Sequence, residues 1–190
     1  MIDNSLLKNE LKLSISKIKA TLKTHQPIDV FSEAQFAFFN AFVDLEQFII
    51  TAYIGYALGE VSIAGYKPTV KIIFPNEIAL RKFHHPIDKF ITVKIIKELY
   101  NDMFDNTVSK NPFANLFETT LYDDYLKMES VRNVIAHKSQ EAYSNFYKKC
   151  NGNTHILLTN YLFVKNKTFD VFYKFMQKIL DISDSIVNPI

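Results

Sequence analysis

Residues 36–58 read FAFFNAFVDLEQFIITAYIGYAL and are apolar on nearly every side of a helix. The stretch is about as long as a membrane span. However, Asp44, Glu46 and Gln47 lie in its middle, and a central acidic residue costs about 2.5–3.5 kcal/mol on insertion scales. We therefore expect the central core helix of a soluble protein, with no membrane contact. It should begin near Ser32, and its Phe-rich seam (Phe36, Phe39, Phe42 and Phe48) should pack inside the protein.

Amphipathic helical patterns continue on both sides of this stretch. We expect helices over residues 4–24, 76–85, 86–106, 112–135 with a break near 119–120, 139–149 and 166–186. Pro86 and Asp88 suit the first turn of the 86–106 helix. Residues 59–75 contain Gly59, Gly65 and Pro68 and are the least helical part, while 154–164 fit a strand or a helix equally.

The composition supports one compact, mostly helical domain over residues 1–190. Apolar residues make up 48% and charged residues 22% of the chain, which is normal for a globular protein. With only 4 Gly and 6 Pro, few turns are possible, and we see no repeat or linker. The expected fold is an all-α bundle of about five to seven helices, with at most a small strand or hairpin within 59–75 or 154–164.

The net charge and the number of cysteines limit which nucleic-acid, disulfide and metal-binding functions are possible. The net charge of +2 is no strong nucleic-acid signature, although a local basic cleft remains possible on a balanced chain. Cys150 is the single cysteine, so no internal disulfide and no multi-cysteine metal site can form. No signal-peptide pattern opens the sequence. We expect a cytoplasmic protein without metal or cofactor.

Four lysines of the first expected helix, Lys8, Lys12, Lys19 and Lys23, fall within about 60° of one another around its axis. Two interpretations stay open. The lysine stems could cover the core at a solvated edge, or the lysines could form part of a track for an RNA backbone.

The most specific segment is residues 129–137, which read ESVRNVIAH. Arg132 and His137 are separated by four residues, Asn133 follows the arginine, and Glu129 stands three residues before it. This arrangement resembles the catalytic motif of the HEPN superfamily, whose active members carry an arginine, often a polar residue next, and a histidine four to six residues after the arginine. The tyrosine that precedes the histidine in some toxins is replaced by Ala136, which departs from those particular subfamilies.

The resemblance implies a compact helical bundle that acts as a metal-independent endoribonuclease in prokaryotic defence, stress response or a toxin–antitoxin system. It implies a homodimer, RNA as substrate, and an antitoxin or another regulatory protein as a further partner. Two alternatives remain: a non-catalytic HEPN-type module that binds nucleotide, RNA or a protein such as a nucleotidyltransferase antitoxin, and a purely structural interaction protein.

The chemistry of the motif can be argued from its side chains alone. Histidine acts as general base or acid near neutral pH, and arginine offers a permanently charged fork to phosphate oxygens. Asn133 could orient the substrate or His137, and Glu129 more plausibly positions Arg132 than reacts. On a helix, however, Arg132 and His137 are about 140° apart around the axis, whereas Asn133 and His137 share a face. A twofold dimer that brings two motifs together resolves this separation.

A structural interpretation of the same residues also exists. A histidine at a helix end is often only a favourable C-terminal charge, and Glu129 and Arg132 could form a weak surface ion pair. His25, His84 and His85 stand without carboxylates at ligand spacing, so we expect surface or loop positions for them and no metal site.

Overall fold

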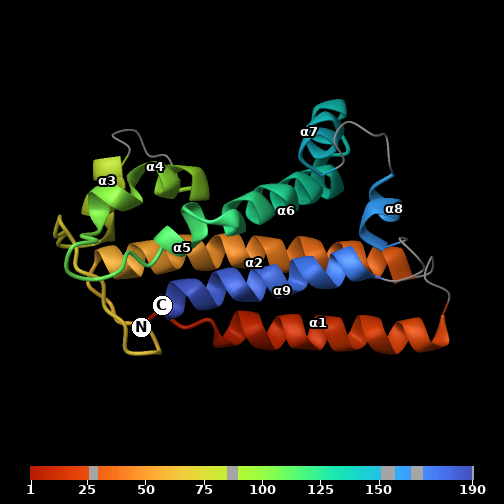
Figure 1. Cartoon of the computed structure of the whole chain (residues 1–190), viewed down its shortest axis with the longest axis horizontal. Coiled ribbons are helices and arrows are strands. Elements are labelled where there is room, and N and C mark those ends of the chain that lie inside the picture. Colours follow the sequence, from red (N-terminus) through yellow and green to blue (C-terminus); the bar gives the residue numbers. More distant parts are fainter. Residues whose placement is uncertain (26–29, 85–89, 151–156, 164–168, 190) are drawn as a thin grey trace. The chain divides into compact units, whose positions relative to one another are not determined.

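The computed structural model describes residues 1–25, 30–84, 90–150, 157–163 and 169–189. The described residues form helices and loops, without a strand (Figure 1). In chain order the helices are α1 (Ser5–Thr24), α2 (Phe31–Ala57), α3 (Glu77–His84), α4 (Val93–Met103), α5 (Ala114–Phe117), α6 (Thr120–His137), α7 (Gln140–Cys150), α8 (Leu158–Phe163) and α9 (Asp170–Val187). Two isolated bridges, Ile2 with Ser62 and Val70 with Phe104, are the strand-like contacts in this part of the chain. The all-α prediction is therefore confirmed.

The expected helices match the observed ones except at two places. The helix expected from residue 86 begins only at Val93, because Thr92 caps it by accepting a hydrogen bond from the Ile95 amide at 3.4 Å. Pro86 and Asp88, the expected first-turn residues, lie outside the described residues. Within 154–164, residues 158–163 are helical, so the strand alternative is wrong for that part.

The chain divides into two compact units, each with its own packing. Unit 1 comprises residues 1–5, 45–121 and 181–190, and unit 2 comprises residues 6–44 and 122–180. The core of unit 1 is aromatic: the Tyr53 ring meets the rings of Phe104 and Phe113 edge-on, with centroids 5.9 and 5.7 Å away. Such edge-to-face pairs stabilise a core beyond their buried area.

Unit 2 contains α1, α7, α8, most of α6, and the parts of α2 and α9 that belong to residues 6–44 and 122–180. Its core is built on Phe38 and Phe42 of α2, both fully buried. Phe38 packs against Phe175 of α9 with ring centroids 5.8 Å apart, and Phe42 packs against Tyr125 of α6 with centroids 5.3 Å apart. One α2 segment thus joins α9 to α6, the helix that carries the motif.

Helix α2 is only partly enclosed by these contacts. It is long and apolar enough to cross a membrane by length and composition, and 44% of its most apolar window is buried inside the protein. The core helix of a soluble protein has the same properties. The expected Phe-rich seam is partly wrong: Phe42 is buried, but Phe36 is 67% exposed.

Candidate functional site

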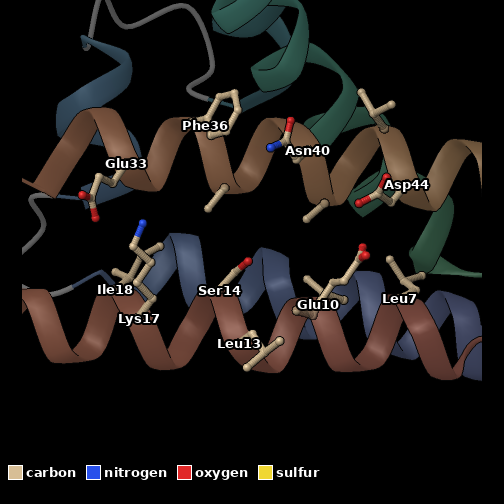
Figure 2. Close-up of a pocket in the computed structure, with 14 residues that line it drawn as sticks. Leu7, Glu10, Leu13, Ser14, Lys17, Ile18, Glu33, Phe36, Asn40 and Asp44 are labelled. Atoms are coloured by element: carbon tan, nitrogen blue, oxygen red, sulfur yellow. The ribbon is translucent and has the colours of Figure 1, made fainter.

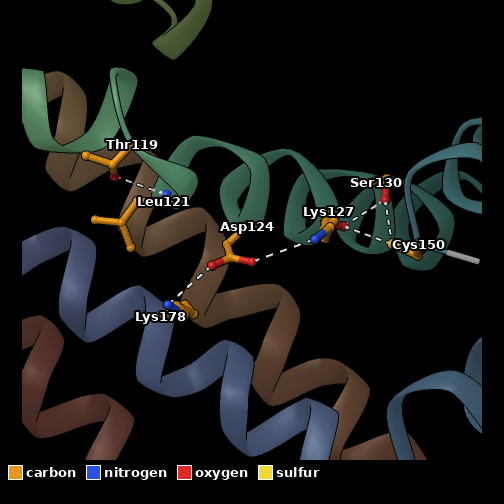
Figure 3. A network of polar contacts seen from close by, with 7 residues as sticks. All are labelled: Thr119, Leu121, Asp124, Lys127, Ser130, Cys150 and Lys178. Carbon is orange, nitrogen blue, oxygen red and sulfur yellow. Dashed lines mark hydrogen bonds and ion pairs between the residues drawn. The ribbon is translucent and has the colours of Figure 1, made fainter.

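The candidate site is carried by α6. Its start is fixed by Thr119, whose hydroxyl accepts a hydrogen bond from the Leu121 amide at 3.2 Å (Figure 3). Within unit 2, α6 buries a stripe of residues three apart in sequence: Tyr125, Met128, Val131 and Val134. Each of these residues neighbours the next, and the buried stripe turns slowly around the helix. Arg132 and Asn133 are half-buried.

Phe42 and Asn133 both contact Arg132. The carbon of its guanidinium lies 5.7 Å from the centroid of the Phe42 ring, within the range of a cation–π contact. Its Nη1 atom donates a hydrogen bond of 2.8 Å to Oδ1 of Asn133. These contacts orient the guanidinium at a half-buried position.

His137 is the last residue of α6 and is exposed. The helix ends there because Lys138 adopts a left-handed conformation, with φ of 49°, while its amide still donates to the Val134 carbonyl at 3.0 Å. Ser139 then opens the next helix by accepting a hydrogen bond from the Ala142 amide at 3.2 Å. The imidazole therefore stands at a sharp corner between α6 and α7.

Glu129 faces α7 and makes a different contact from the expected one. Its carboxylate pairs with Nζ of Lys149 at 3.4 Å, whereas Arg132 donates its hydrogen bond to Oδ1 of Asn133. The sequence suggested Glu129 for that positioning role. Asn133 fills it because its amide oxygen lies next to the arginine along the helix.

Ser130 and Cys150 secure the other side of α6. The Ser130 hydroxyl donates to the Lys127 carbonyl at 2.7 Å and lies 3.4 Å from the Cys150 sulfur (Figure 3). Burial raises the pKa of the Cys150 thiol, which keeps it protonated and therefore a poor nucleophile. This contact packs α7 against α6 and does not resemble a catalytic thiol site.

The structure thus brings Arg132, Asn133 and Phe42 together and leaves His137 open to solvent. On one helix, Arg132 and His137 are about 7.5 Å apart along the axis and about 140° apart around it. The two side chains of one copy therefore leave an ideal helix in different directions. The sequence placed Phe42 in the core seam but not beside Arg132, because no local pattern links residues so far apart along the chain.

The other histidines lie outside α6 in the sequence. His84 is the last residue of α3, is half-buried and shares a 2.8 Å hydrogen bond with the Tyr53 hydroxyl, so the surface or loop position expected for it is wrong. His25 is exposed, and His85 lies outside the described residues. Among the described residues, no three His, Cys, Asp or Glu side chains cluster as metal ligands would.

Unit 2 also contains a groove of about 610 Å³ between α1 and α2. Figure 2 shows the helices antiparallel, with Leu7 near Asp44 and Lys17 near Glu33. Exposed Leu13 and Phe36 line the groove. Burial and the neighbouring Glu10 raise the pKa of Asp44. No residue of α6 lines this groove.

No family model, no curated protein and no solved structure matches this chain, so the functional assignment depends on the geometry described above and on the resemblance of residues 129–137.

Proposed function

We propose that this protein is a metal-independent endoribonuclease of the HEPN type, with Arg132 and His137 as its catalytic residues. The observation that carries the proposal is the difference between the two side chains. Arg132 is oriented by Phe42 and Asn133, as a phosphate-binding group should be, whereas His137 is exposed at the helix corner, where a substrate can reach it. An ordinary surface ion pair needs neither feature.

The reaction follows from these two groups. His137 removes the proton from a ribose 2′-hydroxyl, and the 2′-oxygen attacks the adjacent phosphorus. The bond from phosphorus to the 5′-oxygen breaks, and the leaving oxygen takes a proton from water; the hydroxide so formed is neutralised by the proton on His137. Arg132 stabilises the charge that develops on the phosphate oxygens. The products are a 2′,3′-cyclic phosphate and a 5′-hydroxyl.

The proposed active form is a homodimer. Since Arg132 and His137 diverge around α6, each complete site takes Arg132 from one copy and His137 from the other. A twofold axis near the C-terminal half of α6 produces two such sites at once. The setting that fits such an enzyme is the prokaryotic cytoplasm, in defence, stress response or a toxin–antitoxin pair, where an antitoxin or another regulator restrains it.

Cleavage of single-stranded RNA in EDTA tests the proposal. His137→Ala removes the proton acceptor, and loss of such a group lowers the rate by about 10²- to 10⁴-fold. Arg132→Ala should lower it by about 10²- to 10³-fold, and Arg132→Lys should recover little, because lysine keeps the charge but loses the fork that bonds Asn133.

Exposed His25 at the end of α1 gives a matched control, and His25→Ala should cleave at the wild-type rate. Activity that survives His137→Ala would show that the wrong residue was chosen, and activity abolished by EDTA would show that the mechanism is wrong. If toxicity on induced expression is lost in His137→Ala but kept in His25→Ala, the same assignment holds in cells.

A further inference from the structure

Although the net charge of the chain is small, lysines and carboxylates gather on different surfaces of unit 2. Seven lysines belong to one side of α1 and to α9 and α6: Lys8, Lys12, Lys19, Lys23, Lys127, Lys174 and Lys178. Within unit 2, α6 and α9 carry four carboxylates, Asp123, Asp124, Glu129 and Asp170, of which Glu129 pairs with Lys149 of α7. The groove between α1 and α2 is lined by Glu10 of α1 and by Glu33 and Asp44 of α2, and Lys17 is the lysine among its lining residues.

Specific contacts place the three lysine-bearing helices side by side. Nζ of Lys19 on α1 lies 5.2 Å from the centroid of the Tyr173 ring on α9. One turn further along α9, Nζ of Lys178 pairs with Asp124 of α6 at 3.3 Å (Figure 3). We call the surface formed by these seven lysines the lysine face.

The lysine face is accessible and hollowed. The side chains of Lys127 and Lys178 are 41% and 37% exposed, and Lys12, Lys19, Lys23 and Lys174 are exposed. A pocket of about 320 Å³ between α6, α8 and α9 is lined by Lys127, Lys174 and Lys178, together with Tyr161 and Phe175. Asp124 is shared by Lys127, at 3.9 Å, and Lys178, so one carboxylate offsets two ammonium groups.

We propose that the lysine face binds the phosphate backbone of single-stranded RNA and delivers it to α6. This inference rests on the proposed function and deepens it by placing the substrate outside the motif. Charge complementarity supports it, since a row of like charges across three helices is matched by a polyanion. Lys127 precedes Arg132 by about 7.5 Å and His137 by about 15 Å along α6, and these residues lie about 140° and about 80° away from Lys127 around the axis. A strand that leaves the lysine face at Lys127 therefore passes partly around α6 to reach the motif.

The experiment measures binding without cleavage. In a His137→Ala background with EDTA, the anisotropy of a fluorescent polyuridine of about 20 nucleotides is followed between about 0.05 and 0.2 M salt. A triple variant, Lys19→Gln, Lys174→Gln and Lys178→Gln, should weaken binding by about tenfold or more and reduce the salt slope by about 2, since each phosphate contact to a single strand contributes about 0.7.

Two further variants separate a binding surface from a general charge effect. Lys82→Gln, Lys94→Gln and Lys97→Gln remove the same charge from exposed positions of α3 and α4 and should leave the slope unchanged. Asp124→Asn frees Lys127 and Lys178 and should tighten binding by about three- to tenfold. A variant that merely disturbs the fold cannot tighten binding.

The outcomes are distinct. Equal loss in both triple variants, or no loss in either, overturns the lysine face. Cleavage that depends on His137 but ignores these lysines overturns the inference and leaves the proposed function standing. If RNA binding depends on these lysines but no cleavage depends on His137, the lysine face stands and the proposed function is overturned. If the lysines are needed for binding to phosphatidylserine vesicles and the protein does not bind RNA, the lysine face is a membrane-binding surface and the inference is overturned.

Discussion

At the scale of single residues, the conformation of Lys138 is the feature that places His137. A residue with a side chain is strained at a φ of 49°, and glycine is the usual choice at this position after a helix. The chain instead has lysine between the last residue of α6 and the cap of α7. The corner therefore carries a conformational cost next to the proposed catalytic histidine, as is common at functional sites.

This cost can be measured by substitution. Lys138→Gly should raise the free energy of unfolding by about 1 kcal/mol, which corresponds to about 2–4 °C in Tm for a chain of this size. Lys138→Ala removes the same charge but keeps the Cβ atom, so it should show little of this gain. Thermal melts of the two variants distinguish the effects, and equal gains in both would indicate that charge and not backbone strain is relieved.

At the scale of secondary-structure elements, the α1–α2 groove contains a pH-dependent pair. Burial and the negative charge of Glu10 raise the pKa of Asp44 above its usual 3.8. Between 3.8 and the raised value, the folded protein binds more protons than the unfolded chain, so the free energy of unfolding falls as pH rises through this window. Above this pH window, the loss of stability caused by the ionised Asp44 carboxylate stays constant.

Asp44→Asn removes this penalty while keeping a side chain that can donate to Glu10. The variant should be more stable than the wild type at pH 7, and the two should have equal stability near pH 3, where the wild-type carboxyl is protonated in both states. Asp123→Asn, at an exposed position of α6, serves as the matched control and should show no such pH-dependent gain. Urea denaturation at both pH values measures the difference; a variant less stable at pH 7 contradicts the argument.

The helices also show which parts of the fold could be predicted from the sequence alone. The limits of α1, α2 and α6 could be predicted to within a few residues, because apolar periodicity and local breaks determine them. The start of α4 could not, since Pro86 and Asp88 resemble a first turn and Thr92 does not stand out as the cap. On an all-round apolar helix such as α2, periodicity does not separate the faces, so exposed Phe36 and buried Phe42 looked alike. The contact of Phe42 with Arg132 depends on tertiary packing, which no local pattern encodes.

At the scale of the whole molecule, the proposed composite site makes assembly a condition of activity. Because Arg132 and His137 project from α6 about 140° apart, we expect a homodimer whose interface or interface cleft includes residues 129–137. Light scattering should give twice the mass of the chain. A stable monomer at high concentration would contradict the proposal, as would a dimer with the motif on its outer surface.

Mixing two inactive variants tests whether the site is shared between copies. Purified His137→Ala and Arg132→Ala each lack one component of both sites in their own dimers. After exchange of subunits in a 1:1 mixture, half of the dimers pair one variant with the other, and each such dimer regains one complete site of two. Activity should therefore recover to about a quarter of the wild-type value. If both groups acted from one copy, the mixed dimers would contain no complete site and activity would stay at the level of the separate variants. Light scattering and a tag on one variant establish that the mixed dimers have formed, so that a lack of recovery counts against the composite site and not against the mixing.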